Sequence, residues 1–135
     1  MRSYCIRLVK GLDLLLSIQQ FAEMYEIKAA TVVCGVGCIS RAKLRNADRE
    51  TTTTFDERME IMSLTGTVSS KRAHLHMSAS RSDLSVIGGH LFEGTIIDNT
   101  CELILIELDN VLFDSTKDPD TGFEELLIRR PSFKD

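Results

Sequence analysis

After one helical segment near its start, the chain runs through strand-like segments that follow one another too closely for helices to fit between them. Residues 4–9 predict an opening strand that Gly11 ends, and apolar residues at helical spacing from Leu14 to Tyr25 predict a helix of about four turns. Parallel strands need crossover connections of a dozen or more residues, usually helical. The pattern therefore predicts an α+β fold with a mainly antiparallel central sheet, one long N-terminal helix and few others. Further strands are expected at 29–34, 39–45, 59–68, 73–79, 101–108 and 123–128.

The length predicts a single domain. The chain has 135 residues, 43% of them apolar, which is enough for one core of ordinary size. It contains neither an internal repeat nor a linker-like stretch. We expect one domain over residues 1–135, with a core at about 3–130 and a short C-terminal tail. Residues 46–56 are polar and rich in threonine, which predicts a loop or an exposed strand end.

Two features of the sequence predict a cytoplasmic protein without contact to a membrane. No apolar run approaches the roughly 20 residues that span a bilayer, and Met1 to Tyr4 lack the apolar stretch of a signal peptide. Cysteines are expected to stay reduced in that compartment. We therefore expect four free thiols, at Cys5, Cys34, Cys38 and Cys101.

The charge of the chain disfavours tight, direct binding to DNA. The formal net charge is −4 and the sequence pI is about 5.4. Lysines and arginines are scattered, and only Lys71-Arg72 and Arg129-Arg130 are adjacent pairs. Proteins that hold DNA through its phosphates usually carry a concentrated basic patch.

Two eye-catching segments have ordinary explanations. The segment Cys34-Gly35-Val36-Gly37-Cys38 lacks the Gly-Lys-Ser/Thr ending of a phosphate loop and the second cysteine pair of a zinc knuckle. A tight turn between two strands explains it, since glycine permits positive φ or close backbone packing. The four aspartates within residues 109–120 do not match the spacing of a calcium-binding EF-hand, so a solvated loop is expected there.

All three histidines fall within one short stretch, at His74, His76 and His90. Side chains alternate between the two faces of a strand, so His74 and His76 share one face while Leu75 points to the other. If residues 81–85 form a five-residue turn, Ser80 pairs with Val86 and His76 lies directly opposite His90. A four-residue turn would place His90 on the other face unless a bulge, for instance at Gly88-Gly89, restored it.

Three imidazoles on one face can bind a metal ion. Opposed side chains have Cβ atoms about 5 Å apart, which suits an ion about 2.0–2.1 Å from each nitrogen. Zinc fits best, with nickel, copper or iron as alternatives. Three protein ligands leave a position open, as in catalytic zinc sites, and Glu60 or Glu102 could then serve as general base. The alternative is that these are ordinary histidines that hydrogen-bond to their neighbours.

The order of the motifs resembles that of a known family. Residues 35–44 (GVGCISRAKL) precede residues 60–68 (EIMSLTGTV), which precede His74-Leu75-His76-Met77-Ser78 and residues 86–91 (VIGGHL). This order resembles the PPC (plants and prokaryotes conserved) domain, in its stand-alone prokaryotic form, over nearly the whole chain. The resemblance implies a compact α+β fold with a central antiparallel sheet, a homotrimer, and a metal ion on the matching His74, His76 and His90.

The resemblance also bears on partners. In plant members a short Gly-Arg-Phe-Glu-Ile-Leu element supports partner binding, and residues 57–62 match it in part, which implies partner-binding roles for Arg58, Glu60 and Ile61. Stand-alone members are described as DNA-binding by analogy with the plant proteins. Two departures matter. Cys38 replaces the usual serine, so a role of that hydroxyl does not carry over. Arg129-Arg130-Pro131 lacks the glycine of the AT-hook core, so the feature that delivers DNA binding in the plant proteins is missing.

Three functions follow as hypotheses. The first is a trimeric metal-binding module with an unknown small-molecule or protein partner. The second is a zinc-dependent hydrolase or lyase that uses metal-bound water, with its catalytic residues unknown. The third is a DNA-associated regulatory protein that acts through assembly or a partner.

Overall fold

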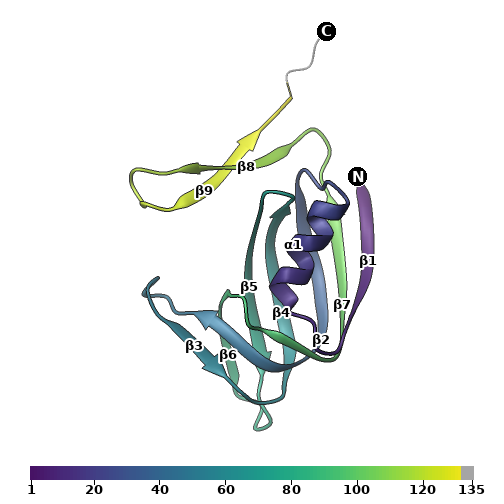
Figure 1. Cartoon of the computed structure of the whole chain (residues 1–135), viewed down its shortest axis with the longest axis vertical. Helices are drawn as coiled ribbons and strands as arrows, with labels where there is room; N and C mark the ends of the chain where they lie inside the picture. Colours follow the sequence, from purple (N-terminus) through teal and green to yellow (C-terminus); the bar gives the residue numbers. More distant parts are fainter. Residues whose placement is uncertain (132–135) are drawn as a thin grey trace.

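The computed structural model describes residues 1–131, which form one large sheet, one helix and a separate hairpin (Figure 1). Every strand pair is antiparallel, which confirms the predicted α+β class with a mainly antiparallel sheet. The order across the large sheet is β1-β7-β2-β4-β5-β6, and β3 pairs with β2. Its strands are β1 (Arg2–Val9), β2 (Ala30–Arg45), β3 (Thr52–Phe55), β4 (Met59–Ser69), β5 (Arg72–Ser80), β6 (Val86–Leu91) and β7 (Ile96–Glu107).

The helix α1 (Leu14–Met24) covers one face of the sheet (Figure 1). Asp13 caps its start, since the side chain accepts a hydrogen bond of 3.0 Å from the backbone N–H of Leu16. The helix has eleven residues, about three turns, so the prediction of a long helix is wrong. It ends early because Glu26 adopts a left-handed conformation with φ 51°, after which the N–H of Ile27 bonds back to the carbonyl of Ala22.

The sheet has a covered inner face and a bare outer face. In β7, Cys101, Leu103 and Leu105 are buried in the core, while Glu102 between them is exposed. The nearly continuous apolar run at residues 101–108 is typical of a strand buried on both faces, but β7 buries only one face. The inner face packs against Leu14, Ile18 and Ala22 of α1, and the largest fully buried apolar side chains belong to this core. We call the two sides of the sheet the inner face and the outer face below.

The strand β2 is continuous through the segment that was expected to turn. Its sixteen residues pair with β7 and β4 in the first part and with β3 and β6 near the end. Gly37 is present because of close packing: a Cβ at this position would lie 2.0 Å from the carbonyl oxygen of Thr100 on β7. The predicted turn at residues 34–38 is therefore wrong, and the glycines serve close approach between strands. Because β2 reaches both β4 and β6, the strands β2, β4, β5 and β6 curl around the core.

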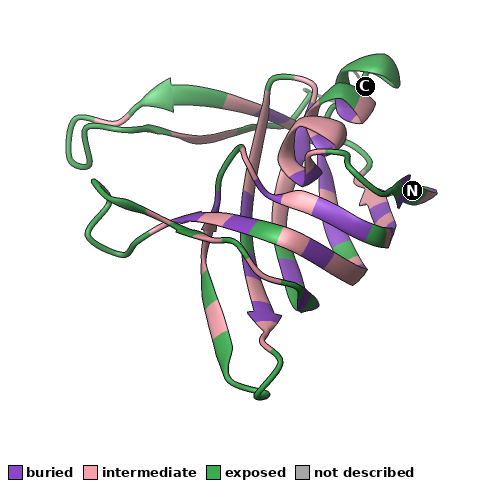
Figure 2. Ribbon diagram, turned by 60° about the horizontal axis from the view of Figure 1, so that its bottom comes forward, coloured by how far each residue is buried: buried purple, intermediate pink, exposed green. Residues whose placement is uncertain are grey.

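The strands β8 (Leu112–Lys117) and β9 (Glu124–Arg129) form a two-stranded hairpin of their own, seen above the main sheet in Figure 1. Its surface is mostly exposed or half-buried (Figure 2). Lys71 contacts it through an ion pair of 3.1 Å with Asp114. The expected solvated loop at residues 109–120 is thus partly a strand, because residues 112–117 pair with β9. Within it, Asp114 forms ion pairs with Lys71 and Arg129. The predicted C-terminal tail falls largely on residues 132–135, outside the described part of the chain.

Within residues 1–131, no helix is both long enough and apolar enough to cross a membrane. The four cysteines are free, as predicted.

Candidate metal site

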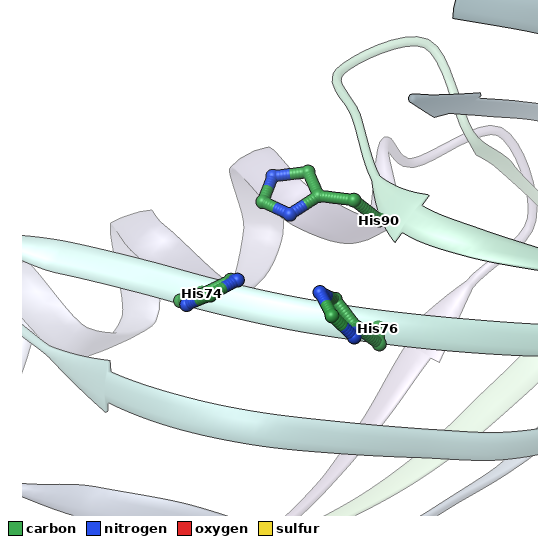
Figure 3. Close-up of side chains that lie close together, drawn as sticks. All are labelled: His74, His76 and His90. Atoms are coloured by element: carbon green, nitrogen blue, oxygen red, sulfur yellow. The ribbon is translucent and has the colours of Figure 1, made fainter. Parts of the chain in front are cut away.

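The histidines lie together on the outer face, on two neighbouring strands (Figure 3). Ser80 pairs with Val86 and His76 pairs with His90, in the register that the five-residue turn predicts. The turn is closed by a hydrogen bond of 2.8 Å from the N–H of Arg81 to the carbonyl of Ser85. Leu75 and Met77 are buried on the opposite side of β5, which fixes the face that the histidines take.

The three rings are close enough to share one ion. Their centroids are 5.0 Å apart for His74 and His76, 5.0 Å for His74 and His90, and 5.4 Å for His76 and His90. One nitrogen from each ring lies within 4.8 Å of the other two. Three nitrogens on one tetrahedral ion, each about 2.1 Å from it, lie about 3.4 Å from one another. Rotations about the side-chain bonds would bring all three onto one ion.

The surroundings keep two of the histidines in the form that binds metals. Burial, followed by the charge of Arg45, lowers the pKa of His90 to about 4. Burial, followed by the charge of His76, also lowers the pKa of His74. At neutral pH both rings are uncharged and carry a free lone pair. The Nδ1 atom of His90 is buried and has no hydrogen-bond partner within residues 1–131, so a metal ligand role fits it better than the alternative of ordinary hydrogen-bonded histidines.

Glycines let the neighbouring strands approach the two that carry the histidines. Gly66 on β4 faces Leu75 with φ 150°, and a Cβ there would lie 2.0 Å from the carbonyl oxygen of His74. Gly89 on β6 packs against β2, where a Cβ would lie 3.0 Å from the carbonyl oxygen of Arg45. Larger residues at these two positions would push the strands apart and separate the rings.

Two clefts open on either side of the histidines and share Arg45, Arg49 and His90. The first cleft, about 510 Å³, adds His74, Arg72 and the hairpin residues Phe123, Glu124 and Glu125. The second cleft, about 430 Å³, adds His76, Asn46 and the two glycines of β6. Both volumes are in the range of small-molecule sites. The site is therefore a histidine cluster with room for a ligand on both sides.

The sequence interpretation missed the arginines around the histidines. Arg72 could have been found, because it lies two residues before His74 on the same strand and shares its face. Arg45 carried no such signal, because it meets His90 only through the pairing of β2 with β6, 45 residues away. Glu124 and Glu125 enter through the hairpin, which the sequence interpretation did not place next to the histidines.

The other predicted site residues lie elsewhere. Arg58 is exposed and forms an ion pair of 3.1 Å with Asp98, and Glu60 accepts a hydrogen bond of 3.3 Å from the thiol of Cys38. Ile61 is buried in the core. Partner binding by Arg58, Glu60 and Ile61 stays a prediction. Neither Glu60 nor Glu102 lines the two clefts at the histidines.

Comparisons with known proteins point to one family. The family model of the Plants and Prokaryotes Conserved (PCC) domain, the PPC domain of the sequence analysis, matches residues 1–109. A hypothetical protein from Salmonella cholerae-suis has a similar structure, with a TM-score of 0.93 and 29% identity over 97% of this chain and 95% of the other.

Two further solved structures are described by function. A metal-containing protein from Archaeoglobus fulgidus has a TM-score of 0.76 and 27% identity, with 94% of each chain covered. A presumed DNA-binding protein from Bacteroides thetaiotaomicron has a TM-score of 0.82 and 26% identity, over 92% of this chain and 90% of the other.

The curated relatives are much longer than this chain. The bifunctional protein GlmU of Synechococcus sp. (strain JA-3-3Ab) is 35% identical over 130 residues, which are 96% of this chain and 21% of the relative. GlmU of Synechococcus sp. (strain JA-2-3B'a(2-13)) is 33% identical over 129 residues, 96% of this chain and 20% of the relative. The chain thus spans about a fifth of the length of the curated relatives that it matches.

Proposed function

Because the chain belongs to the Plants and Prokaryotes Conserved domain family, we propose that it is a metal-binding module that holds a divalent transition metal ion, zinc by preference, on His74, His76 and His90. The observation that carries this proposal is the grouping of three ligand nitrogens within 4.8 Å beside two clefts. The similarity of this chain to a metal-containing protein from Archaeoglobus fulgidus supports the proposal. Neutral imidazoles are the ligands that zinc prefers among the side chains present here.

The chemistry of the site follows from the number of ligands. A zinc ion with three protein ligands keeps a position open and can act there as a Lewis acid. The chain's own residues then position the ion: β5 and β6 fix the histidines, and the clefts admit a ligand beside them. The natural ligand is a small molecule or a segment of a protein partner.

Metal content of the purified protein tests the proposal. We expect about one zinc ion per chain in the wild type by elemental analysis after dialysis, and loss of most of it in His76→Ala. Ser78→Ala is the matched control, because Ser78 lies two residues further on the same face of β5 and should keep the ion. Circular dichroism spectra of all three proteins should agree. A wild type without stoichiometric metal, after incubation with zinc, nickel, copper and iron in turn, would contradict the proposal.

A homotrimer is the assembly that we propose. The support is the outer face, where Val36 and Met62 are exposed although apolar. Large exposed apolar side chains on one face are typical of a surface that contacts another chain. A second copy of this chain is the occupant that the family resemblance implies.

Association with DNA is the second candidate, favoured by the presumed DNA-binding protein from Bacteroides thetaiotaomicron. The net charge of −4 means that such binding would depend on assembly or a partner. Gel shifts across a series of salt concentrations separate this candidate from the first, since contacts to phosphates weaken with salt. A hydrolase or lyase is the third candidate, favoured by the clefts at the histidines. Turnover of small esters, amides or phosphates that a chelator stops would identify it.

A further inference from the structure

Positively charged side chains surround the histidines. Arg45 and Arg49 line both clefts, and Arg72 lines the first. Arg45 pairs directly with His90 across β2 and β6, and Arg72 lies on the face of His74. Arg49 adopts a left-handed conformation with φ 69° in the loop between β2 and β3, and is part of the wall of both clefts.

These arginines have no acidic partner in the structure. Within residues 1–131, neither Arg45 nor Arg49 nor Arg72 forms an ion pair. The Nη1 atom of Arg72 is buried and has no hydrogen-bond partner among the described residues. The guanidinium of Arg45 instead lies 5.8 Å from the ring centre of Phe123. Arginines that line a cleft without forming an ion pair are typical of a site for an anion.

The arginines also repel a metal ion on the histidines. Like charges at a partly buried site raise the free energy of binding a divalent cation, and a guanidinium does not lose its proton at any ordinary pH. A negatively charged ligand removes this conflict, because it attracts the metal ion and the arginines together. The charges of the site are therefore complementary to a cation and an anion bound side by side.

The two clefts differ in how well they suit an anion. The hairpin residues Glu124 and Glu125 line the first cleft and would repel it. Among residues 1–131, no acidic side chain lines the second cleft, which combines Arg45 and Arg49 with His76 and His90. Its volume of about 430 Å³ suits a small molecule.

We propose that the second cleft binds a small oxyanion, a carboxylate or phosphate group, which Arg45 and Arg49 hold beside the metal ion on the histidines. This inference rests on the proposed function. It adds the chemical class of the ligand and names the two arginines that select it. Charge-assisted hydrogen bonds from a guanidinium to such a group are among the stronger polar contacts in proteins.

Calorimetric titration of the zinc-loaded protein tests the inference, with inorganic phosphate and acetate as the two probes. We expect phosphate to bind, and its Kd to rise about tenfold in Arg45→Gln and in Arg49→Gln, the effect of losing one hydrogen bond to a charged group. Arg41→Gln is the control, since Arg41 is an exposed arginine of β2 that pairs with Asp56 and lines neither cleft. The ratio of the two affinities tells a phosphate ligand from a carboxylate.

Metal analysis of every variant separates the proposed metal binding from the inferred binding of an oxyanion. Zinc should remain at one ion per chain in the arginine variants, because no arginine is a ligand. If zinc is bound but neither probe binds, or if Arg45→Gln and Arg49→Gln bind phosphate like the wild type, the inference is wrong and the proposed function stands. A wild type without metal would overturn both. Arg49 is exposed in a loop, so its variant is expected to fold even if Arg45→Gln does not.

Discussion

At the scale of single residues, Gly66 decides whether β4 and β5 can pair next to the histidines. Its φ is 150°, and a Cβ would lie 2.0 Å from the carbonyl oxygen of His74 and 2.9 Å from the Cα atom of Leu75. Both contacts are with backbone, which cannot rotate away as a side chain does. An added methyl group would therefore displace the strand that carries His74 and His76.

We expect Gly66→Ala to lower the free energy of unfolding by about 3 kcal/mol, because backbone strain adds to the displaced strand. Urea unfolding at a fixed protein concentration measures it. Gly11→Ala is the control, since Gly11 also has positive φ, 88°, but no atom of the described chain lies within 4 Å of an added Cβ there. That variant should lose only about 1 kcal/mol. Equal losses in the two variants would show that the close approach at Gly66 has no energetic weight.

The candidate site shows which residues a sequence can reveal. His74 and His76 share a face because side chains alternate along a strand. His90 joins them because the turn at residues 81–85 is short, so its length predicts that His90 lies opposite His76. Arg72 follows from the same alternation. Arg45 and Arg49 do not follow from alternation. The curl of the sheet brings the end of β2, and the loop after it, next to β6, and this pairing joins residues far apart in the chain. Local periodicity predicted the grouping of the histidines, whereas long-range pairing placed the arginines beside them.

At the scale of elements, the end of α1 is held by a residue that is poorly suited to its conformation. Glu26 lies in the left-handed region with φ 51°, its N–H bonds to the carbonyl of Glu23 at 3.1 Å, and the N–H of Ile27 bonds to that of Ala22 at 2.9 Å. Helices usually place glycine at this position, because a Cβ is disfavoured there. The side chain of Glu26 is exposed and forms no ion pair within residues 1–131.

We expect Glu26→Gly to raise the free energy of unfolding by about 0.5–1 kcal/mol, since it relieves left-handed strain at a helix end. The midpoint of urea unfolding should shift upward without a change in slope. Gln20→Gly places the same residue at an exposed position inside the helix, where glycine should cost about 1 kcal/mol. Destabilisation by both substitutions would mean that strain at Glu26 is not significant.

Element boundaries were harder to predict where glycine was involved. The two glycines within residues 34–38 predict a turn, because closely spaced glycines are typical of turns. In the fold, Gly35 and Gly37 lie inside β2, and a Cβ on Gly35 would lie 2.8 Å from a side-chain atom of Leu64. Glycine serves both turns and close packing, and only the neighbouring strands show which applies. The helix, β4 and β5 were predicted because each has a periodic apolar pattern facing the core.

At the scale of the whole molecule, the outer face of the sheet presents exposed apolar side chains beside the candidate site. Val36 and Met62 are 55% and 61% exposed there, next to partly exposed Ile104 on β7. The histidines lie on this same outer face, further across the sheet on β5 and β6. Burying these apolar side chains between copies of the chain would remove them from water, which is the main source of stability in such interfaces.

The proposed homotrimer predicts that sedimentation velocity gives the mass of three chains, each of 15.1 kDa. We expect Val36→Lys to sediment as a single chain, because burying an ammonium group between copies is costly. The substitution should not unfold the chain, since Val36 lies opposite Glu102 on β7 and the new lysine can pair with it. Met24→Lys is the control: Met24 is also apolar and 76% exposed, but belongs to α1 on the other side of the sheet, so this variant should stay trimeric. Single chains in the wild type, or trimers in Val36→Lys, would rule out the outer face as the contact between copies.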